Sequence, residues 1–123
     1  MPLSQVKPKQ QASRITSAAQ AIDVAQQLAQ EFRSGAARRD RERELPVAPL
    51  RALFASGLGA ITVPGEFGGA DVSTAVLAQV IAMISEADAA IGQVPQNHFY
   101  ALEVLRLNGN TAQQQRFYQE VLE

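Results

Sequence analysis

The chain has 123 residues, 46% of them hydrophobic, and its 11 Lys and Arg against 12 Asp and Glu leave a formal net charge of −1. This length supports one domain with an ordinary core, and the near-zero charge gives no basic field for nucleic acid. The absence of cysteine excludes disulfides and thiolate chemistry. With only one histidine as well, no metal site is expected.

The N-terminal segment MPLSQVKPKQQASRIT is polar and has no apolar stretch typical of a secretory signal. The longest apolar run, AVLAQVIAMI at 75–84, is shorter than the roughly 20 residues that a membrane helix requires. We therefore expect a cytoplasmic protein without a membrane partner. Residues 1–16 are expected to form a flexible arm and 17–123 to form the folded domain.

The first predicted helix covers about 17–43, with Ser17 as its N-cap and apolar residues recurring every three or four positions. Pro46 ends it, and VAPLRALFASG predicts a short second helix that Gly57 terminates. The two Gly-containing pairs that follow force turns, so residues 58–73 are expected to form an ordered loop with an extended start.

The third predicted helix begins after Ser73 or Asp71 and is apolar on more than one side, which is typical of a central helix in a bundle. Asp88 can cap a fourth helical segment over 89–107. The Asn-Gly-Asn stop signal then precedes a last helix capped by Thr111. Patterning alone therefore predicts an all-α bundle of about five helices.

Three segments, in this order, resemble the acyl-CoA dehydrogenase superfamily. The segment at 45–73 carries Leu-Pro, Gly-Leu through Val-Pro, and Glu-Phe-Gly-Gly; the others are ISEADAAIG at 84–92 and LNGNTAQQQRFYQEVL at 107–122. A fourth stretch, GQVPQNHFYALEVLRL at 92–107, is similar to the sulfur-acquisition branch, which includes relatives of the dibenzothiophene and dimethylsulfone monooxygenases.

The resemblance implies a subunit with an N-terminal helical domain, a middle β domain and a C-terminal four-helix bundle. The chain matches only the first of these and is expected to be a fragment that lacks the other two. A flavin, FMN or FAD, is implied as cofactor, held mostly by the absent parts. A homotetramer of the complete subunit is implied as well, with the 123-residue chain inactive by itself.

The candidate catalytic residue is His98. Its spacing from Ile91, Val94 and Leu105 places it on the apolar stripe, where a core histidine bound to a backbone carbonyl is one interpretation. Pro95 disturbs the helix one turn earlier, which favours a functional interpretation. The resemblance places this helix along the substrate pocket.

A neutral imidazole there could donate a hydrogen bond or a proton to an oxygen of the substrate or of the oxygenated flavin. Asn97, Phe99 and Tyr100 are the other candidate residues of the substrate and flavin pocket. For each of them a packing or surface role is the competing interpretation.

The sequence is compatible with three functions. The first is a reduced-flavin monooxygenase for a small organosulfur compound, served by a flavin reductase. The second is an FAD-dependent acyl-CoA dehydrogenase, which needs a glutamate base in the missing bundle. The third is a helical interaction module without catalysis.

Overall fold

The computed structural model describes residues 11–123, and residues 1–10 lie outside this range. Its α-helices and 3-10 turns are α1 (Ala18–Glu42), α2 (Val47–Ala55), η2 (Leu58–Ala60), η3 (Gly65–Phe67), α3 (Thr74–Ala87), α4 (Ala89–Gln93), α5 (Gln96–Asn108) and α6 (Thr111–Leu122). No β-strand occurs among residues 11–123, so the predicted all-α fold is confirmed.

Two of the predicted helix starts are reproduced by side-chain caps. The hydroxyl of Ser17 accepts a hydrogen bond from the backbone N–H of Gln20 at the start of α1. Ser73 does the same for Val76 at the start of α3, so Ser73 rather than Asp71 is the cap. Each cap satisfies a backbone donor that the first helical turn leaves unpaired.

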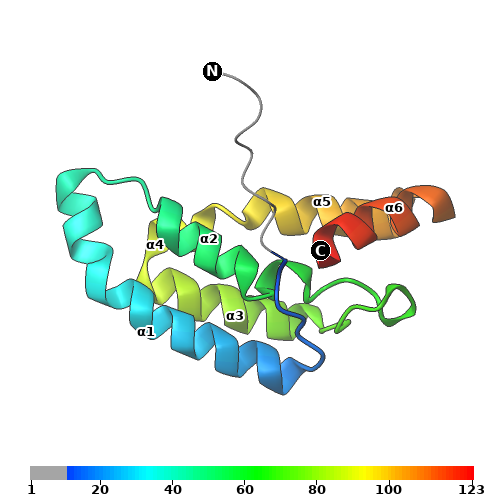
Figure 1. The fold of residues 1–123 in the computed structure, drawn as a ribbon, viewed down its shortest axis with the longest axis horizontal. Helices are drawn as coiled ribbons and strands as arrows, with labels where there is room; N and C mark the ends of the chain where they lie inside the picture. The colour runs from blue at the N-terminus through cyan, green and yellow to red at the C-terminus, as the bar shows by residue number, and fades with distance from the viewer. Residues whose placement is uncertain (1–10) are drawn as a thin grey trace.

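The helices form two groups (Figure 1). α1 and α3 lie side by side, α2 runs back in the direction opposite to α1, and α4 connects α3 to α5. The α5–α6 hairpin lies at the other end, beside the loop that carries η3. The end of α6 returns to η2, so η2 lies where the two groups meet.

The core is divided between these two groups. The larger cluster joins α1, α2, η2, α3 and α4, and the smaller one joins the η3 loop to α5 and α6. Phe99 packs against both clusters. Phe67 is partly buried with its ring 5.0 Å from that of Tyr118, so it anchors the η3 loop to the smaller cluster.

Residues 11–16, part of the expected N-terminal arm, contact the domain. Ile15 is 5% exposed and belongs to the larger cluster. The backbone N–H groups of Ala12 and Ser13 donate to the carbonyl oxygens of Glu123 and Ala55, at 3.2 and 2.8 Å. The remainder of the arm lies outside the described residues.

Residues 58–63, expected to begin the loop in an extended form, instead form η2 and a further turn. Gly57 makes this possible because its φ of 91° starts the turn in the left-handed region, which favours glycine. Ile61 and Val63 are fully buried, one in each core cluster. The turn thus contributes one buried side chain to each core cluster, which the expected extended segment did not predict.

The predicted helix over 89–107 is divided into α4 and α5. Pro95 is the N-cap of α5, so its missing N–H removes no bond from the helix interior. Asp88 caps α4 as predicted. At the last helix the cap is Asn110 rather than Thr111, because Asn110 and Gln113 exchange side-chain-to-backbone hydrogen bonds in a capping box.

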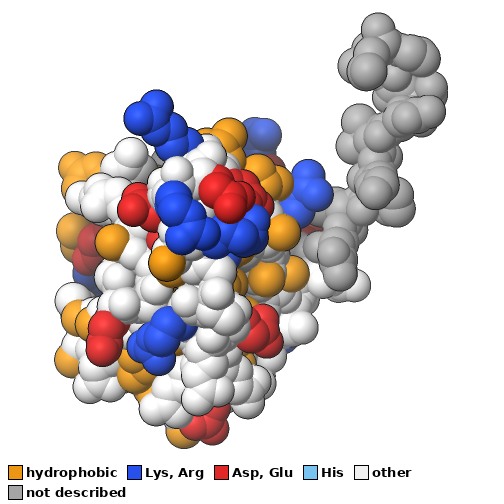
Figure 2. Space-filling model, turned by 90° about the vertical axis from the view of Figure 1, so that its left-hand side faces the viewer, with side chains coloured by type: hydrophobic (Ala, Val, Ile, Leu, Met, Phe, Trp, Pro, Cys, Tyr) orange, Lys and Arg blue, Asp and Glu red, His pale blue; other side chains and the backbone are white. Residues whose placement is uncertain are grey.

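The surface shows no segregation of charge on the face in Figure 2, where positive and negative side chains are mixed. Within the described chain, no helix is both long enough and apolar enough to cross a membrane.

Candidate active-site face

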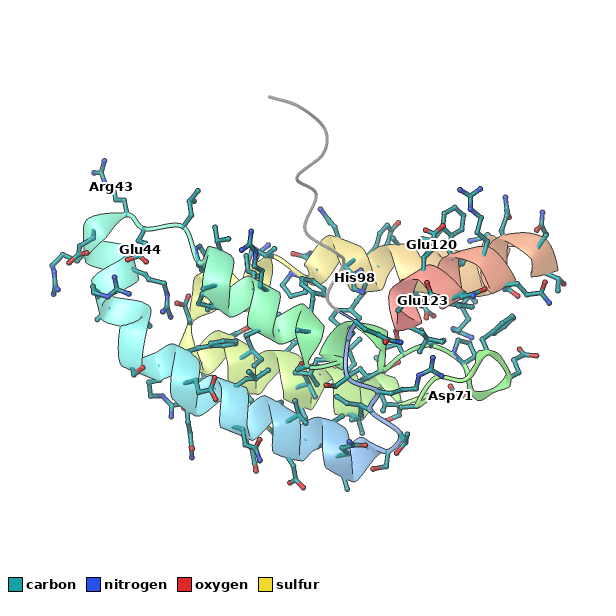
Figure 3. The ribbon with its side chains drawn as sticks, viewed as in Figure 1. Arg43, Glu44, Asp71, His98, Glu120 and Glu123 are labelled. Atoms are coloured by element: carbon teal, nitrogen blue, oxygen red, sulfur yellow. The ribbon has the colours of Figure 1, made fainter. Side chains whose placement is uncertain are left out.

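His98 lies in the first turn of α5, near the middle of the molecule where α5 begins and α6 ends (Figure 3). Its Nε2 is 2.7 Å from the carbonyl oxygen of Gly59 in η2. Because a carbonyl only accepts, Nε2 carries the proton in this contact. The histidine thus has the backbone-carbonyl partner that a core histidine needs, and it links α5 to the junction of the two core clusters.

Two phenylalanine rings fix the plane of the imidazole. The ring of Phe54, from α2, is 5.4 Å from that of His98 at an interplanar angle of 79°. The ring of Phe99 is 5.2 Å away at 73°. Both are edge-to-face arrangements, which aromatic pairs favour over parallel stacking. Together with the carbonyl of Gly59, these contacts hold the imidazole in one orientation.

The side of the molecule that carries His98 is hollowed by two open cavities of about 810 and 660 Å³. The first lies between α2, η2 and the end of α6, and the second lies between α5 and α6. Both are lined by His98, Glu120 and Val121, so we describe them as one trough, the α2–α5–α6 trough. His98 lies where its two halves meet.

The trough is mainly apolar. Four large hydrophobic side chains line it while remaining over a third exposed, namely Val47, Phe54, Val104 and Phe117. Leu50, Leu102 and Leu105 line it as well. Grouped exposed apolar side chains of this kind are typical of a surface that binds a ligand or another protein part.

The charged groups of the trough lie on two helices. Arg51 comes from α2, and Glu120 and Glu123 come from the end of α6. Nε of Arg116 donates to Glu120 at 3.4 Å. The lining therefore offers an apolar wall, one imidazole, one guanidinium and the carboxylates of Glu120 and Glu123. These groups fit the ring of a flavin or an apolar substrate, whereas Arg51 alone is a weak match for a pyrophosphate chain.

The other predicted pocket residues lie apart from the trough. Asn97 is exposed and Tyr100 is 70% exposed, and neither lines either of its cavities. Successive residues of an α-helix are rotated by about 100° around its axis, so Asn97 and Tyr100 lie on other sides of α5 than His98 and Leu102. Phe99 contacts the imidazole edge and is otherwise part of the core. A role of these three residues in the pocket stays a prediction.

Sequence reasoning missed the residues that reach His98 from other elements. Gly59 and Phe54 come from the segment between Leu45 and Ser73 that carries the family motifs, but their contact with α5 is tertiary. The apolar spacing of Val47, Leu50 and Phe54 indicates a common face of α2. It does not indicate which element, if any, covers that face.

Comparison with known proteins gives the context for this geometry. The family model for the acyl-CoA dehydrogenase N-terminal domain matches residues 17–123. The dibenzothiophene monooxygenases of Rhodococcus erythropolis and Rhodococcus qingshengii are 33% identical to the chain over 102 residues, which is 81% of this chain and 24% of theirs. No solved structure gives a significant match.

The matched region begins at the cap of α1 and continues to Glu123, and it contains both core clusters apart from Ile15 and the whole trough apart from Ala12. The chain spans about a quarter of the length of the curated relatives, at 24%. The predicted resemblance is confirmed, and the chain belongs to the acyl-CoA dehydrogenase N-terminal domain family.

Proposed function

We propose that this domain is part of a flavin-dependent oxidoreductase, and that the enzyme is a reduced-flavin monooxygenase acting on a small organosulfur compound. The name of the relatives, dibenzothiophene monooxygenase, supports this choice. The structural observation that carries it is the accessible imidazole of His98 at the centre of an apolar trough. A purely structural histidine does not need two adjoining cavities.

The residues of the trough would act by orientation and by exclusion of water. Val47, Phe54 and Phe117 would provide the apolar contact area for a flat ligand. His98 would provide the polar contact that orients it. A reduced flavin, when bound, supplies the activation of oxygen, and the protein supplies binding and orientation.

The open trough also defines what the rest of the enzyme must provide. With more than a third of Val47, Phe54, Val104 and Phe117 exposed, the described residues do not close a pocket. Further parts of the subunit would cover the trough and hold most of the flavin, FMN or FAD. A flavin reductase would supply the reduced cofactor, and the complete subunit would form a tetramer.

The second candidate is an acyl-CoA dehydrogenase, which the family model favours by its name. The distinction rests on residues beyond this chain. A glutamate base in the C-terminal bundle favours the dehydrogenase, and a second histidine that reaches the same trough favours the monooxygenase.

The two functions are separated by one assay on the complete enzyme. Purified protein is supplied either with reduced flavin, oxygen and a panel of organosulfur compounds, or with acyl-CoA thioesters and an electron-accepting dye. Oxygen-dependent oxidation of an organosulfur compound supports the proposal. Dye reduction with acyl-CoA alone overturns it in favour of the dehydrogenase, and the absence of both activities favours a non-catalytic helical module.

A further inference from the structure

The hydrogen bond of His98 has a consequence for which of its two ring nitrogens can act. We infer that Gly59 is a positioning residue for His98: its carbonyl holds the neutral imidazole as the Nε2–H tautomer and leaves Nδ1 as a hydrogen-bond acceptor toward the α2–α5–α6 trough. The chemical part of this inference rests on the proposed function, whereas the tautomer does not.

The first support is the rigidity of the acceptor. Gly59 is buried, and it lies between Leu58, 1% exposed, and Ile61, 0% exposed. The left-handed Gly57 and the hydrogen bond from Ala60 to Gly57 fix the η2 turn. The carbonyl oxygen therefore cannot turn toward another donor without moving the core, and the 2.7 Å contact requires a proton on Nε2.

The second support is the state of Nδ1. Among residues 11–123, no hydrogen bond to Nδ1 of His98 occurs. The buried side-chain polar atoms that lack a partner in this range belong to Thr62 and Tyr118. Because Nδ1 has no partner and is not one of these buried atoms, it is accessible to solvent. His98 lines both cavities of the trough, so open space adjoins its ring.

The third support is the tight space around the contact. A Cβ at Gly59 would lie 2.8 Å from Cδ1 of Phe54 and 3.5 Å from Nε2 of His98. The absence of a Cβ therefore lets the Phe54 ring pack against the η2 turn, whereas the distance to His98 is an ordinary contact. Gly59 has no positive φ, so alanine there is allowed by the backbone and acts through its contact with Phe54.

The chemical consequence concerns the direction of the hydrogen bond. In the neutral ring the only N–H belongs to Nε2 and is used by Gly59, so Nδ1 accepts from a ligand and does not donate to it. If Nδ1 takes a proton from a ligand, the product is an imidazolium that still donates to Gly59 through Nε2. Only in that charged form does His98 donate to a substrate oxygen. The sequence led us to expect a neutral imidazole that donates, whereas this arrangement makes the neutral ring an acceptor.

The test uses the fact that His98 is the only histidine of the chain. Ring ¹⁵N-labelled histidine then gives a single set of long-range ¹H–¹⁵N signals, recorded at a pH where the ring is neutral. The reference is the same chain unfolded in urea, which reports the intrinsic tautomer ratio. A hydrogen bond of ordinary strength predicts that folding raises the Nε2–H to Nδ1–H ratio at least about fivefold.

Two glycine variants provide the matched comparison. Gly59→Ala keeps the carbonyl but is expected to displace the Phe54 ring, which holds the plane of the imidazole, and so to weaken the contact and move the ratio toward that of the unfolded chain. Gly65→Ala is the control, because a Cβ there meets only Oδ2 of Asp71, at 3.7 Å. It should keep the wild-type ratio.

An unchanged ratio on folding, or an Nδ1–H majority, overturns the inference. Its failure is separable from that of the proposed function. In the complete enzyme, His98→Gln can donate from its side-chain amide to Gly59 but has no titratable nitrogen. The predicted tautomer together with wild-type turnover of His98→Gln would leave the positioning by Gly59 intact and remove the catalytic role of His98.

Discussion

The guanidinium of Arg39 lies 2.9 Å from the carboxylate of Asp88, and this pair joins the last turns of α1 to the start of α4. The side chains of the two residues are only 10% and 9% exposed. Arg39 also donates to the carbonyl of Phe32, and the second carboxylate oxygen of Asp88 accepts from the N–H groups of Ala90 and Ile91. One carboxylate thus serves as both ion-pair partner and helix cap.

We expect Asp88→Ala to lower the free energy of unfolding by roughly 3–5 kcal/mol, because it leaves the buried guanidinium of Arg39 without a counter-charge. The control is Glu44→Ala, which breaks the ion pair with Arg38, whose side chain is 50% exposed. This change should cost less than about 1 kcal/mol. Urea denaturation measures both, and equal losses would contradict the structural role given to Asp88.

Tyr118 provides a second prediction, because its hydroxyl is buried without a hydrogen-bond partner among residues 11–123. Burial raises the pKa of Tyr118, with smaller effects from Arg106, Glu103 and Glu66. The folded state therefore favours the protonated phenol. The stability that this group contributes is complete below its unfolded pKa, about 10, and is lost as pH rises through the higher folded pKa.

Tyr118→Phe should therefore leave stability at pH 7 unchanged or raise it by up to about 1 kcal/mol. It should also reduce the loss of stability on the alkaline side. Tyr100→Phe is the control, since Tyr100 is 70% exposed. Unfolding curves at neutral pH and above pH 10 provide the measurement. A Tyr118→Phe variant much less stable than the wild type at neutral pH would show that the hydroxyl has a partner.

The loop that carries η3 depends on Gly69, where a Cβ would lie 2.0 Å from the carbonyl oxygen of Val63. A contact under 3.0 Å with backbone forces the chain to move, and Val63 is fully buried. Gly69→Ala should lower the free energy of unfolding by at least about 2 kcal/mol. Gly65→Ala, in the same loop, should stay within about 0.5 kcal/mol of the wild type. Equal melting temperatures for the two variants would be inconsistent with this packing.

The open trough leads to a prediction for the 123-residue chain by itself. The described residues form only one apolar wall of the trough, and Arg51 is the guanidinium that they offer to a phosphate group. The chain should therefore not bind flavin with micromolar affinity. It should, however, bind an apolar fluorescent dye at the exposed side chains of the trough. Titrations with oxidised and anaerobically reduced flavin test the first point, and micromolar binding in either would be the opposing result.

The sequence predicted the helices well wherever a local signal determines the backbone. Ser17, Ser73 and Asp88 are caps with a nearby N–H to accept, and all three act as expected. Asn110 rather than Thr111 is the last cap, with Gln113 completing its capping box; Thr111 and Gln114 have the same spacing, so this local signal does not distinguish the two. The residues at 58–63 were predicted poorly, because Ile61 and Val63 are turned inward by two separate cores that local patterning does not reveal.

The site was predictable only in part for the same reason. Periodicity placed His98 on the inward side of its helix, and the structure confirms that it is partly buried. Its partner Gly59 is 39 residues away in sequence, and Phe54 reaches it from a different helix. Contacts at such separation depend on tertiary packing, so the sequence left the core and the functional interpretations of His98 open.

The geometry shows that these two interpretations are compatible, since one nitrogen binds the core and the other is accessible. Two variants separate the structural contribution of Nε2 from the functional contribution of Nδ1. His98→Gln retains a donor for Gly59, whereas His98→Leu leaves that carbonyl without it and should cost about 1 kcal/mol more in stability. Thermal or urea unfolding of the pair measures this difference. Equal stability of the two variants would remove the structural role.

The most direct measurement is turnover and flavin affinity of the complete enzyme, compared between wild type and His98→Gln. If His98 acts on the substrate or the cofactor, turnover should fall at least about 100-fold, while flavin affinity and melting temperature change little. Wild-type turnover in this variant would contradict the account and return His98 to a purely structural role.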